Sequence, residues 1–282
     1  MPSKRVLLTG ASNLIGSHIL DQLLSFNDVA VRAVVASRDE ALGLRQQYPS
    51  TSHPLLDFAI VAQKDIAIPR AYNLAPAQTY EPFDTVIHIV PPDPSEEADC
   101  LSRFINLETG ALINFLRNVQ DIAPGVRRVV IITSLTSFAR WLVDPRLERN
   151  PRNANGSPAR APVIDSDYVL ATSRASDNIV CDAIWKWSSE NRVGFELISF
   201  AAPSIYGPSI RPLSNSSDLE DSNRRIWNIC SNDSSELVTS PPYGIDYYTD
   251  VRDLAFAIVQ AAFVPEARNR RFLVSAGMMP PG

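Results

Sequence analysis

Short apolar runs rich in Val and Ile recur along the chain and alternate with longer amphipathic stretches. The runs occupy residues 5–9, 29–35, 55–61, 85–90, 128–133 and 195–199. Runs of this length without polar alternation are typical of strands buried on both faces. Residues 96–119, between two of them, carry apolar side chains at spacings of three and four, as a helix does. The alternation predicts an α/β fold, a doubly wound parallel sheet with helices on both faces.

The composition restricts the classes of partner. With 282 residues, of which 45% are hydrophobic, the chain can bury a large core. A net charge of -5 without a basic run argues against nucleic acid, and no apolar run approaches the roughly 20 residues that cross a membrane. Three cysteines without paired spacing, and no signal-peptide-like segment, predict reduced thiols in the cytoplasm. We expect a small-molecule substrate and no metal.

Two polar segments interrupt the alternation. Residues 144–166 are rich in Pro and charge, and residues 214–235 are rich in Ser, Asn and Asp, with a short helical patch around residues 223–230. Clusters of this kind predict surface loops or lids.

The turn between the first strand and the first helix carries two glycines, Gly10 and Gly16. In this position a first glycine permits a tight turn and a last one lets the helix pack on the sheet, so that the helix N-terminus can meet a pyrophosphate. Asn13 stands where a middle glycine would. Because Asn tolerates the left-handed region, we expect the turn to survive, with less room for phosphates. A turn that holds no ligand is the alternative.

The loop and later segments resemble one family. Residues 9–20 resemble the T-G-x-x-G-F-I-G-S-H loop of the extended short-chain dehydrogenases/reductases, the NAD-dependent epimerase/dehydratase superfamily. Further motifs follow in the family's order: VRAVVAS, DTVIHIV, INLETGALINFL, RRVVIITS, APSIYGP and YTDVRDLAFAIV. They are most similar to the dihydroflavonol reductase and fungal aldehyde/ketone reductase branch. The resemblance implies a Rossmann domain over 1–200, a small, interleaved substrate region over 201–282, NADP(H) and a Ser/Tyr/Lys catalytic set.

The resemblance also implies where the dinucleotide binds. The implied cofactor contacts are Gly10, Ser12, Asn13, Leu14, Ile15, Gly16, Ser37, Arg38, Asp65, Ile66, Ile89, Val90, Pro91, Thr133, Pro203 and Ile205. The branch has an Arg for the 2′-phosphate of NADP, but Ala36 stands there, and the acidic residues Asp39 and Glu40 follow. The sequence therefore leaves NADP(H) and NAD(H) open, and we expect weak binding.

The catalytic set departs further from the family. Leu135 occupies the position of the Ser that orients the carbonyl, which leaves Ser134 beside it. An ungapped comparison places the family's Tyr-x-x-Ser-Lys on residues 173–177, so that Ser173 replaces Tyr and Asp177 replaces Lys. Tyr168, five residues earlier, is a displaced candidate for the phenol.

These replacements leave three functions open. A reductase needs a phenol whose pKa is lowered by an ammonium, and Ser beside a carboxylate does not supply one. The first function is therefore isomerisation, dehydration or cyclisation of a carbonyl compound in specialised metabolism, with Asp177 as base. The second is an NADP(H)-dependent carbonyl reductase with Tyr168 as proton donor. The third is a silent nucleotide- or partner-binding module.

The remaining polar and aromatic residues have mostly structural interpretations. His88 is expected to be a hydrogen-bonded core histidine, Trp185 and Trp187 are expected to pack, and Asp250 and Asp253 to cap a helix. The predicted substrate pocket contains Tyr206, after the last long strand, and Asp93. The amphipathic helices at 96–119 and 174–190 are the expected surfaces for a homodimer.

Overall fold

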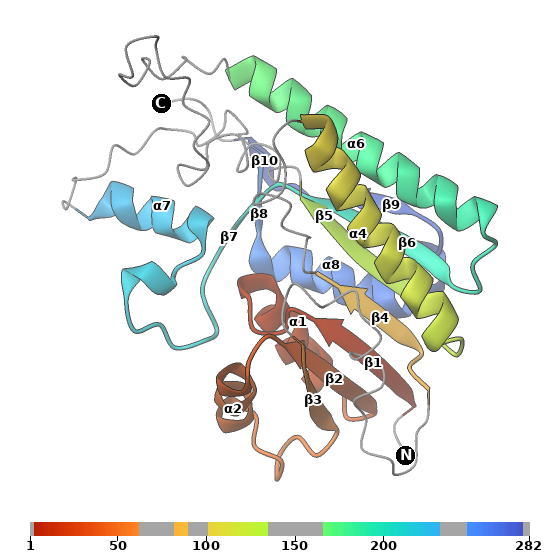
Figure 1. The fold of residues 1–282 in the computed structure, drawn as a ribbon. Helices are drawn as coiled ribbons and strands as arrows, with labels where there is room; N and C mark the ends of the chain where they lie inside the picture. The colour runs from red at the N-terminus through yellow and green to blue at the C-terminus, as the bar shows by residue number, and fades with distance from the viewer. Residues whose placement is uncertain (1–2, 62–81, 90–100, 135–165, 232–246, 279–282) are drawn as a thin grey trace, which may run out of the picture.

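A parallel sheet forms the centre of the protein. The computed structural model describes residues 3–61, 82–89, 101–134, 166–231 and 247–278. Seven strands lie in the order β3-β2-β1-β4-β5-β6-β9 (Figure 1). They are β1 (Lys4–Thr9), β2 (Val29–Val35), β3 (Leu56–Ile60), β4 (Thr85–His88), β5 (Arg128–Ser134), β6 (Glu196–Ala202) and β9 (Arg271–Leu273). All neighbouring strands are parallel, so the predicted doubly wound sheet is confirmed.

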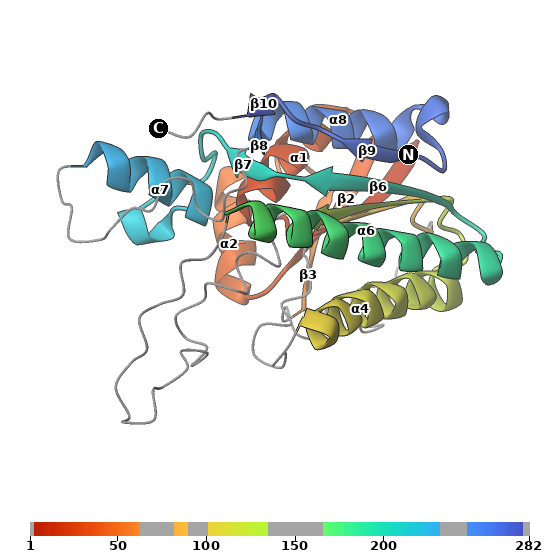
Figure 2. The same ribbon diagram turned by 90° about the horizontal axis from the view of Figure 1, so that it is seen from above.

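Helices cover both faces of this sheet (Figure 2). One face carries α1 (Leu14–Leu24), α2 (Arg38–Gln47) and α8 (Val251–Phe263), whose buried residues share one core cluster. The other carries α4 (Leu101–Ile122) and α6 (Ser166–Glu190), which pack on each other and on a second cluster. Among the described helices, none is both long enough and apolar enough to pass through a membrane.

A smaller sheet lies beyond the carboxyl end of β6. It consists of β7 (Ser204–Tyr206), β8 (Tyr247–Asp250) and β10 (Gly277–Met278), in the order β10-β8-β7. The helical patch predicted near residues 223–230 is α7 (Asp221–Cys230), which follows a 3-10 turn at Ser216–Asp218. Most of the predicted loop 144–166 lies outside the described residues. The predicted division at residue 200 stays a prediction, although β9 and α8, from beyond that point, join the main layers.

The first turn of α1 packs very closely against the loop that follows β1. Gly10 has φ 66°, in the left-handed region that glycine tolerates. A Cβ built on Gly16 would lie 2.0 Å from the carbonyl oxygen of Gly10. The helix can therefore approach the loop only because Gly16 has no side chain.

Asn13 does not have the conformation that we expected. Its φ of -82° and ψ of 175° are extended, and its side chain caps α1 by accepting a hydrogen bond from the Gly16 N–H at 2.8 Å. The left-handed tolerance of Asn is therefore not used here. The residue follows the ordinary preference of Asn for the N-cap position, where its side-chain oxygen satisfies a free N–H.

His88 is a core histidine, as predicted. Its side chain is 2% exposed, stacks on Phe115 with ring centroids 3.8 Å apart, and places Nδ1 2.9 Å from the Thr9 hydroxyl. The same hydroxyl accepts a hydrogen bond from the Ile89 N–H at 3.2 Å. Burial lowers the pKa of His88 from 6.5 to about 3. The contacts therefore join the carboxyl ends of β1 and β4 around a neutral imidazole.

Gly16→Ala tests the close contact at the start of α1. Because the new Cβ would meet a backbone oxygen, we expect a loss of about 3 kcal/mol in the free energy of unfolding, measured by urea denaturation. Gly43→Ala on α2 is the matched control: a Cβ there has no neighbour within 4 Å, and the gain in helix propensity predicts up to about 1 kcal/mol of stabilisation. Equal effects of the two variants would contradict the steric argument.

His88→Gln tests the buried neutral imidazole. Between pH 6.5 and about 3 the unfolded chain binds a proton at this residue that the folded chain does not. The free energy of unfolding is therefore expected to fall with decreasing pH, by up to about 1.4 kcal/mol per pH unit from this residue. His88→Gln should remove this contribution to the slope of the unfolding free energy against pH. The control variant His53→Gln, at a half-buried residue, should retain it. Parallel pH curves for wild type and His88→Gln would refute the assignment.

Candidate functional site

The N-terminus of α1 already holds an anionic side chain. Asn13 satisfies the Gly16 N–H, and the Leu14 N–H donates to the carboxylate of Glu220 at 3.3 Å. Free N–H groups and the helix dipole make such a terminus favourable for an anion. Glu220 comes from the start of α7, far along the chain, and was not predicted. No sequence signal marks it, because the contact depends on the path of residues 207–220.

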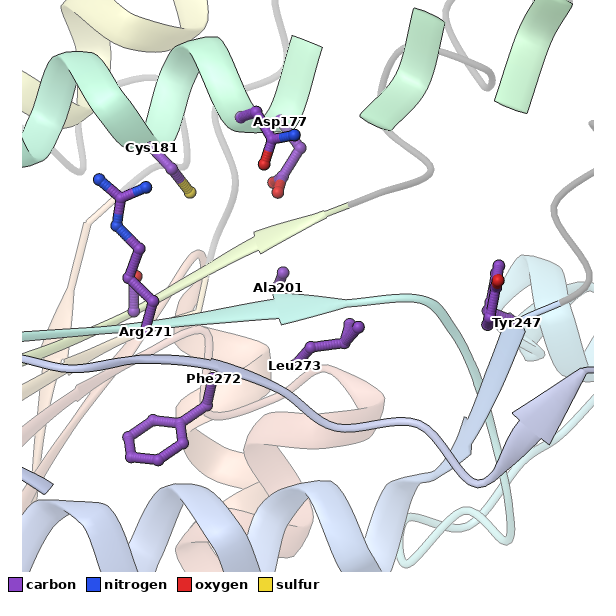
Figure 3. A pocket seen from close by; sticks show the side chains of 9 residues that line it. Asp177, Cys181, Ala201, Tyr247, Arg271, Phe272 and Leu273 are labelled. Carbon is purple, nitrogen blue, oxygen red and sulfur yellow. The ribbon is translucent and has the colours of Figure 1, made fainter. Parts of the chain in front are cut away.

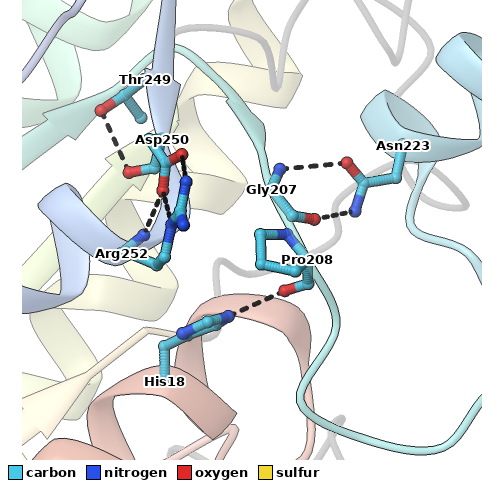
Figure 4. A network of polar contacts seen from close by, with 7 residues as sticks. All are labelled: His18, Gly207, Pro208, Asn223, Thr249, Asp250 and Arg252. Carbon is cyan, nitrogen blue, oxygen red and sulfur yellow. Dashed lines mark hydrogen bonds and ion pairs between the residues drawn. The ribbon is translucent and has the colours of Figure 1, made fainter.

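A network of polar contacts holds that path in place (Figure 4). The side-chain amide of Asn223 on α7 donates to the Gly207 carbonyl at 2.6 Å and accepts from the Gly207 N–H at 3.2 Å. Nε2 of His18 on α1 lies 2.8 Å from the Pro208 carbonyl oxygen. Gly207 has φ 141°, and a Cβ there would lie 2.6 Å from Val251. These contacts hold α7 near α1 and so bring Glu220 to the N-terminus of α1.

The start of α8 completes this region. Asp250 caps the helix by accepting a hydrogen bond from the backbone N–H of Arg252 at 2.8 Å. It also forms an ion pair with the guanidinium of Arg252 at 2.6 Å. The hydrogen bond from the Arg252 side chain is the main reason why the pKa of Asp250 falls to about 2. The predicted capping role of Asp250 is confirmed.

A second carboxylate lies at the carboxyl end of β2. Glu40 Oε2 accepts a hydrogen bond from the Ala36 N–H at 3.2 Å and contacts the Ser12 hydroxyl of the glycine loop. Ser37 caps α2 by accepting the Glu40 N–H at 3.2 Å. Arg38 begins α2 and is exposed. The sequence S-x-x-E at 37–40 is typical of a capping box and could have located Glu40.

Asp177 lines a cavity of about 430 Å³ between α6, β6 and β9 (Figure 3). Its side chain is 8% exposed and points toward the cavity with that of Cys181, while Arg271 rises from β9. Burial raises the pKa of Asp177, and a hydrogen bond from Thr133 and the charge of Arg271 oppose the shift. Burial, followed by the charge of Asp177, raises the pKa of Cys181 to about 11. Burial therefore disfavours the ionised forms of Asp177 and Cys181, while Arg271 partly offsets that effect.

The structure describes only some of the other predicted site residues. Ser134 ends β5, and Tyr168 and Ser173 lie on α6, but their side chains lie outside the described ones. Ile89 is buried after β4, and Pro203, Ile205 and Tyr206 follow β6. Tyr206 is not among the residues that line the cavity at Asp177. Five predicted residues lie outside the described part of the chain: Asp65, Ile66, Val90, Pro91 and Asp93.

The two tryptophans of α6 pack as predicted. Trp185 and Trp187 lie against the second core cluster, and the indole N–H of Trp185 donates to the Ser199 hydroxyl at 3.2 Å. Cys181 and Cys230 are free cysteines, the first buried and the second exposed.

Curated relatives match the chain over almost its whole length. An uncharacterized oxidoreductase of Schizosaccharomyces pombe is 27% identical over 100% of this chain and 80% of its own. Ketoreductase azaE of Aspergillus niger is 28% identical over 98% of this chain and 78% of its own. No protein-family model matches the chain.

Solved structures share the fold. The yeast methylglyoxal/isovaleraldehyde reductase Gre2, complexed with NADPH, has a TM-score of 0.64 at 23% identity and covers 96% of this chain and 78% of its own. Gre2 of Candida albicans, also complexed with NADPH, has a TM-score of 0.66 at 20% identity over 98% of this chain and 79% of its own. The chain has the fold of the extended short-chain dehydrogenases/reductases, the superfamily that its glycine loop and later motifs resemble.

Proposed function

We propose that the protein binds a nicotinamide dinucleotide at the carboxyl end of its parallel sheet and reduces the carbonyl group of a small molecule. The observation that carries the proposal is the turn from β1 to α1. Gly10 has a positive φ, Gly16 permits the close approach of the helix, and the N-terminus of α1 is occupied by a carboxylate. The two glycines are typical of the turn that receives a pyrophosphate, and the contact with Glu220 is consistent with a helix N-terminus that accepts an anion.

The residues present fit the dinucleotide. The Leu14 N–H, which donates to Glu220, would hold a pyrophosphate oxygen, and Ser12 with the end of β2 would face the adenosine ribose. The buried contacts of His88 and Thr9 fix the end of β4, next to Ile89, which would lie near the ribose if the resemblance holds for this segment. The bound dinucleotide supplies the hydride; the chain must bind the substrate and supply a proton.

The names of the relatives support reduction. One is a ketoreductase, and a solved structure with the same fold is a methylglyoxal/isovaleraldehyde reductase. Isomerisation, dehydration or cyclisation in specialised metabolism, the first function inferred from Ser173 and Asp177, finds no support in them. The carbonyl reductase, the alternative inferred from the sequence, agrees with them better.

Carbonyl reduction also requires a group that donates a proton to the substrate oxygen. Asp177 lies where burial raises its pKa, and it is engaged with Thr133 in the cavity under α6. Tyr168 on the same helix carries a phenol, the group that carbonyl reduction in this fold uses. We therefore propose Tyr168 as the donor and assign Asp177 to the packing of α6 on β5.

Reduction is tested by following oxidation of NADH and NADPH with methylglyoxal, isovaleraldehyde and a panel of ketones. We expect the wild type to turn over at least one of these substrates. Tyr168→Phe should lower kcat by about 10²- to 10⁴-fold, because a general acid contributes about that much. Asp177→Asn should change kcat little. Thermal unfolding of both variants controls for folding. Turnover that survives Tyr168→Phe and disappears in Asp177→Asn would reverse the two roles. Binding without turnover would favour a silent module, and no binding of either dinucleotide would refute the proposal.

Glu220→Gln tests the anion site at α1. Because the carboxylate competes with a pyrophosphate for the same N–H, its neutralisation is expected to tighten dinucleotide binding about two- to fivefold, as measured by calorimetry. Asp218→Asn removes an equal charge from an exposed residue two positions earlier and should leave the dissociation constant unchanged. Weaker binding in Glu220→Gln would mean that the carboxylate supports the site instead of occupying it.

A further inference from the structure

We propose that the cavity between α6, β6 and β9 is a second ligand site, which binds a small monocarboxylate with an aromatic or branched aliphatic body (Figure 3). The proposal does not rest on the proposed function. In the sheet order, β4 and β5 lie between β6 and β1, whose turn would receive the dinucleotide. Three strand spacings, about 14 Å, therefore separate the two sites along the sheet.

Small side chains at the edge of the sheet leave room for a ligand. Ser199 and Ala201 on β6 lie in register beside Arg271 and Leu273 on β9, and all four line the cavity. Residues two apart on a strand point to the same face, here the face that α6 covers. The cavity volume of about 430 Å³ falls in the range of small-molecule sites, roughly 300–1,000 Å³.

Helix α6 forms the opposite wall of the cavity, and the edge of the sheet provides the entrance. Asp177 and Cys181 of α6 are 8% and 6% exposed, so the inner part of the cavity is shielded from water. β9 is the last strand of the sheet, and its Leu273 is 60% exposed. A ligand can therefore enter beside β9 and place its apolar body against Leu273, Ala201 and Cys181.

Arg271 supplies the positive charge that recognises the carboxylate. Its side chain is 44% exposed, and its Nη1 forms an ion pair with Asp182 at 2.6 Å. Asp182 is 71% exposed, so water screens this pair and a ligand can share the guanidinium at little cost. A guanidinium matches the geometry of a carboxylate through two parallel hydrogen bonds. A cationic amine would instead be repelled at this end of the cavity.

Asp177 restricts the charge of the ligand. Burial raises its pKa, against a hydrogen bond from Thr133 and the charge of Arg271, and so favours the neutral carboxyl group. A neutral carboxyl group has a proton to donate, and a carboxylate accepts it in a strong hydrogen bond. An anion with more charge, such as phosphate, would lose more hydration than these groups replace. The cavity therefore fits one carboxylate and an apolar body.

The test uses three probes of one shape: phenylacetate, its amide phenylacetamide, and 2-phenylethylamine. The indole N–H of Trp185 donates to the Ser199 hydroxyl in the cavity wall at 3.2 Å, and the Trp185 ring lies 5.3 Å from Cζ of Arg271. Its NMR signal therefore reports occupancy, and Trp185→Phe identifies it among the four tryptophans.

Phenylacetate is expected to shift the Trp185 indole signal with a dissociation constant on the order of 1 mM or below, the range that a ligand of this size reaches. The amide and the amine should bind about tenfold more weakly or worse, because each lacks one charge-assisted hydrogen bond. Inorganic phosphate should leave the signal in place at concentrations at which phenylacetate saturates it.

Three variants locate the binding. Arg271→Gln should weaken phenylacetate about tenfold or more. Lys186→Gln is the matched control, because it removes an equal charge from an exposed residue of α6 that does not line the cavity. It should leave the affinity unchanged. Ala201→Leu fills part of the cavity and should abolish the titration. Thermal unfolding of each variant shows whether the fold is kept.

The contrary outcomes are distinct. Equal affinities for the three probes, tighter binding of the amine, or an unchanged affinity in Arg271→Gln would overturn the assignment to a carboxylate. An equal loss in Lys186→Gln would reduce the effect to general charge and would overturn it too. Displacement of phenylacetate by saturating NADH or NADPH would make the cavity part of the dinucleotide site. If neither dinucleotide binds, the proposed function fails while this site stands.

Discussion

The contact between Gly16 and the carbonyl oxygen of Gly10 determines how α1 leaves the sheet. With no Cβ at Gly16, the first turn of α1 lies against the loop, and its buried face reaches the core cluster that it shares with α8. The same approach points the helix N-terminus at the carboxyl ends of β1 and β2. The carboxylates of Glu220 and Glu40 both contact this region, at the Leu14 N–H and at the Ser12 hydroxyl. The polar contacts at the N-terminus of α1 therefore depend on the absence of a side chain at Gly16.

The sequence predicted the sheet well because fully buried strands leave a direct signal. The Val- and Ile-rich runs correspond to β1 to β6, and the alternation with helices identified a parallel sheet. β9 was not predicted, since Arg271–Leu273 is too short to form a pattern. The role of His88 was also accessible from sequence, because a histidine within an apolar strand needs a buried hydrogen-bond partner, here Thr9.

The details of the site were less accessible. Asn13 was correctly located but given the wrong conformation, because two features of Asn, its left-handed tolerance and its capping ability, predict different backbones. Glu40 could have been found from the capping pattern after Ser37. Glu220 could not, because its place at α1 depends on the Asn223 and His18 contacts that fold the chain back. Asp177 was assigned to the right helix, but the cavity that it lines is also lined by residues of β9, a strand that the sequence had not revealed.

The pairing of α1 with α8 also has a consequence for the order of synthesis. Ile19, Leu20 and Leu23 of α1 are fully buried in the finished protein, in the cluster that includes Leu254 and Ile258 of α8. A ribosome adds about 5–20 residues per second, so on the order of ten to fifty seconds separates the two helices during translation. Throughout that interval the nascent chain exposes an apolar helix face whose partner has not been made. Until α8 is made, that face of α1 is available to chaperones that bind exposed apolar segments.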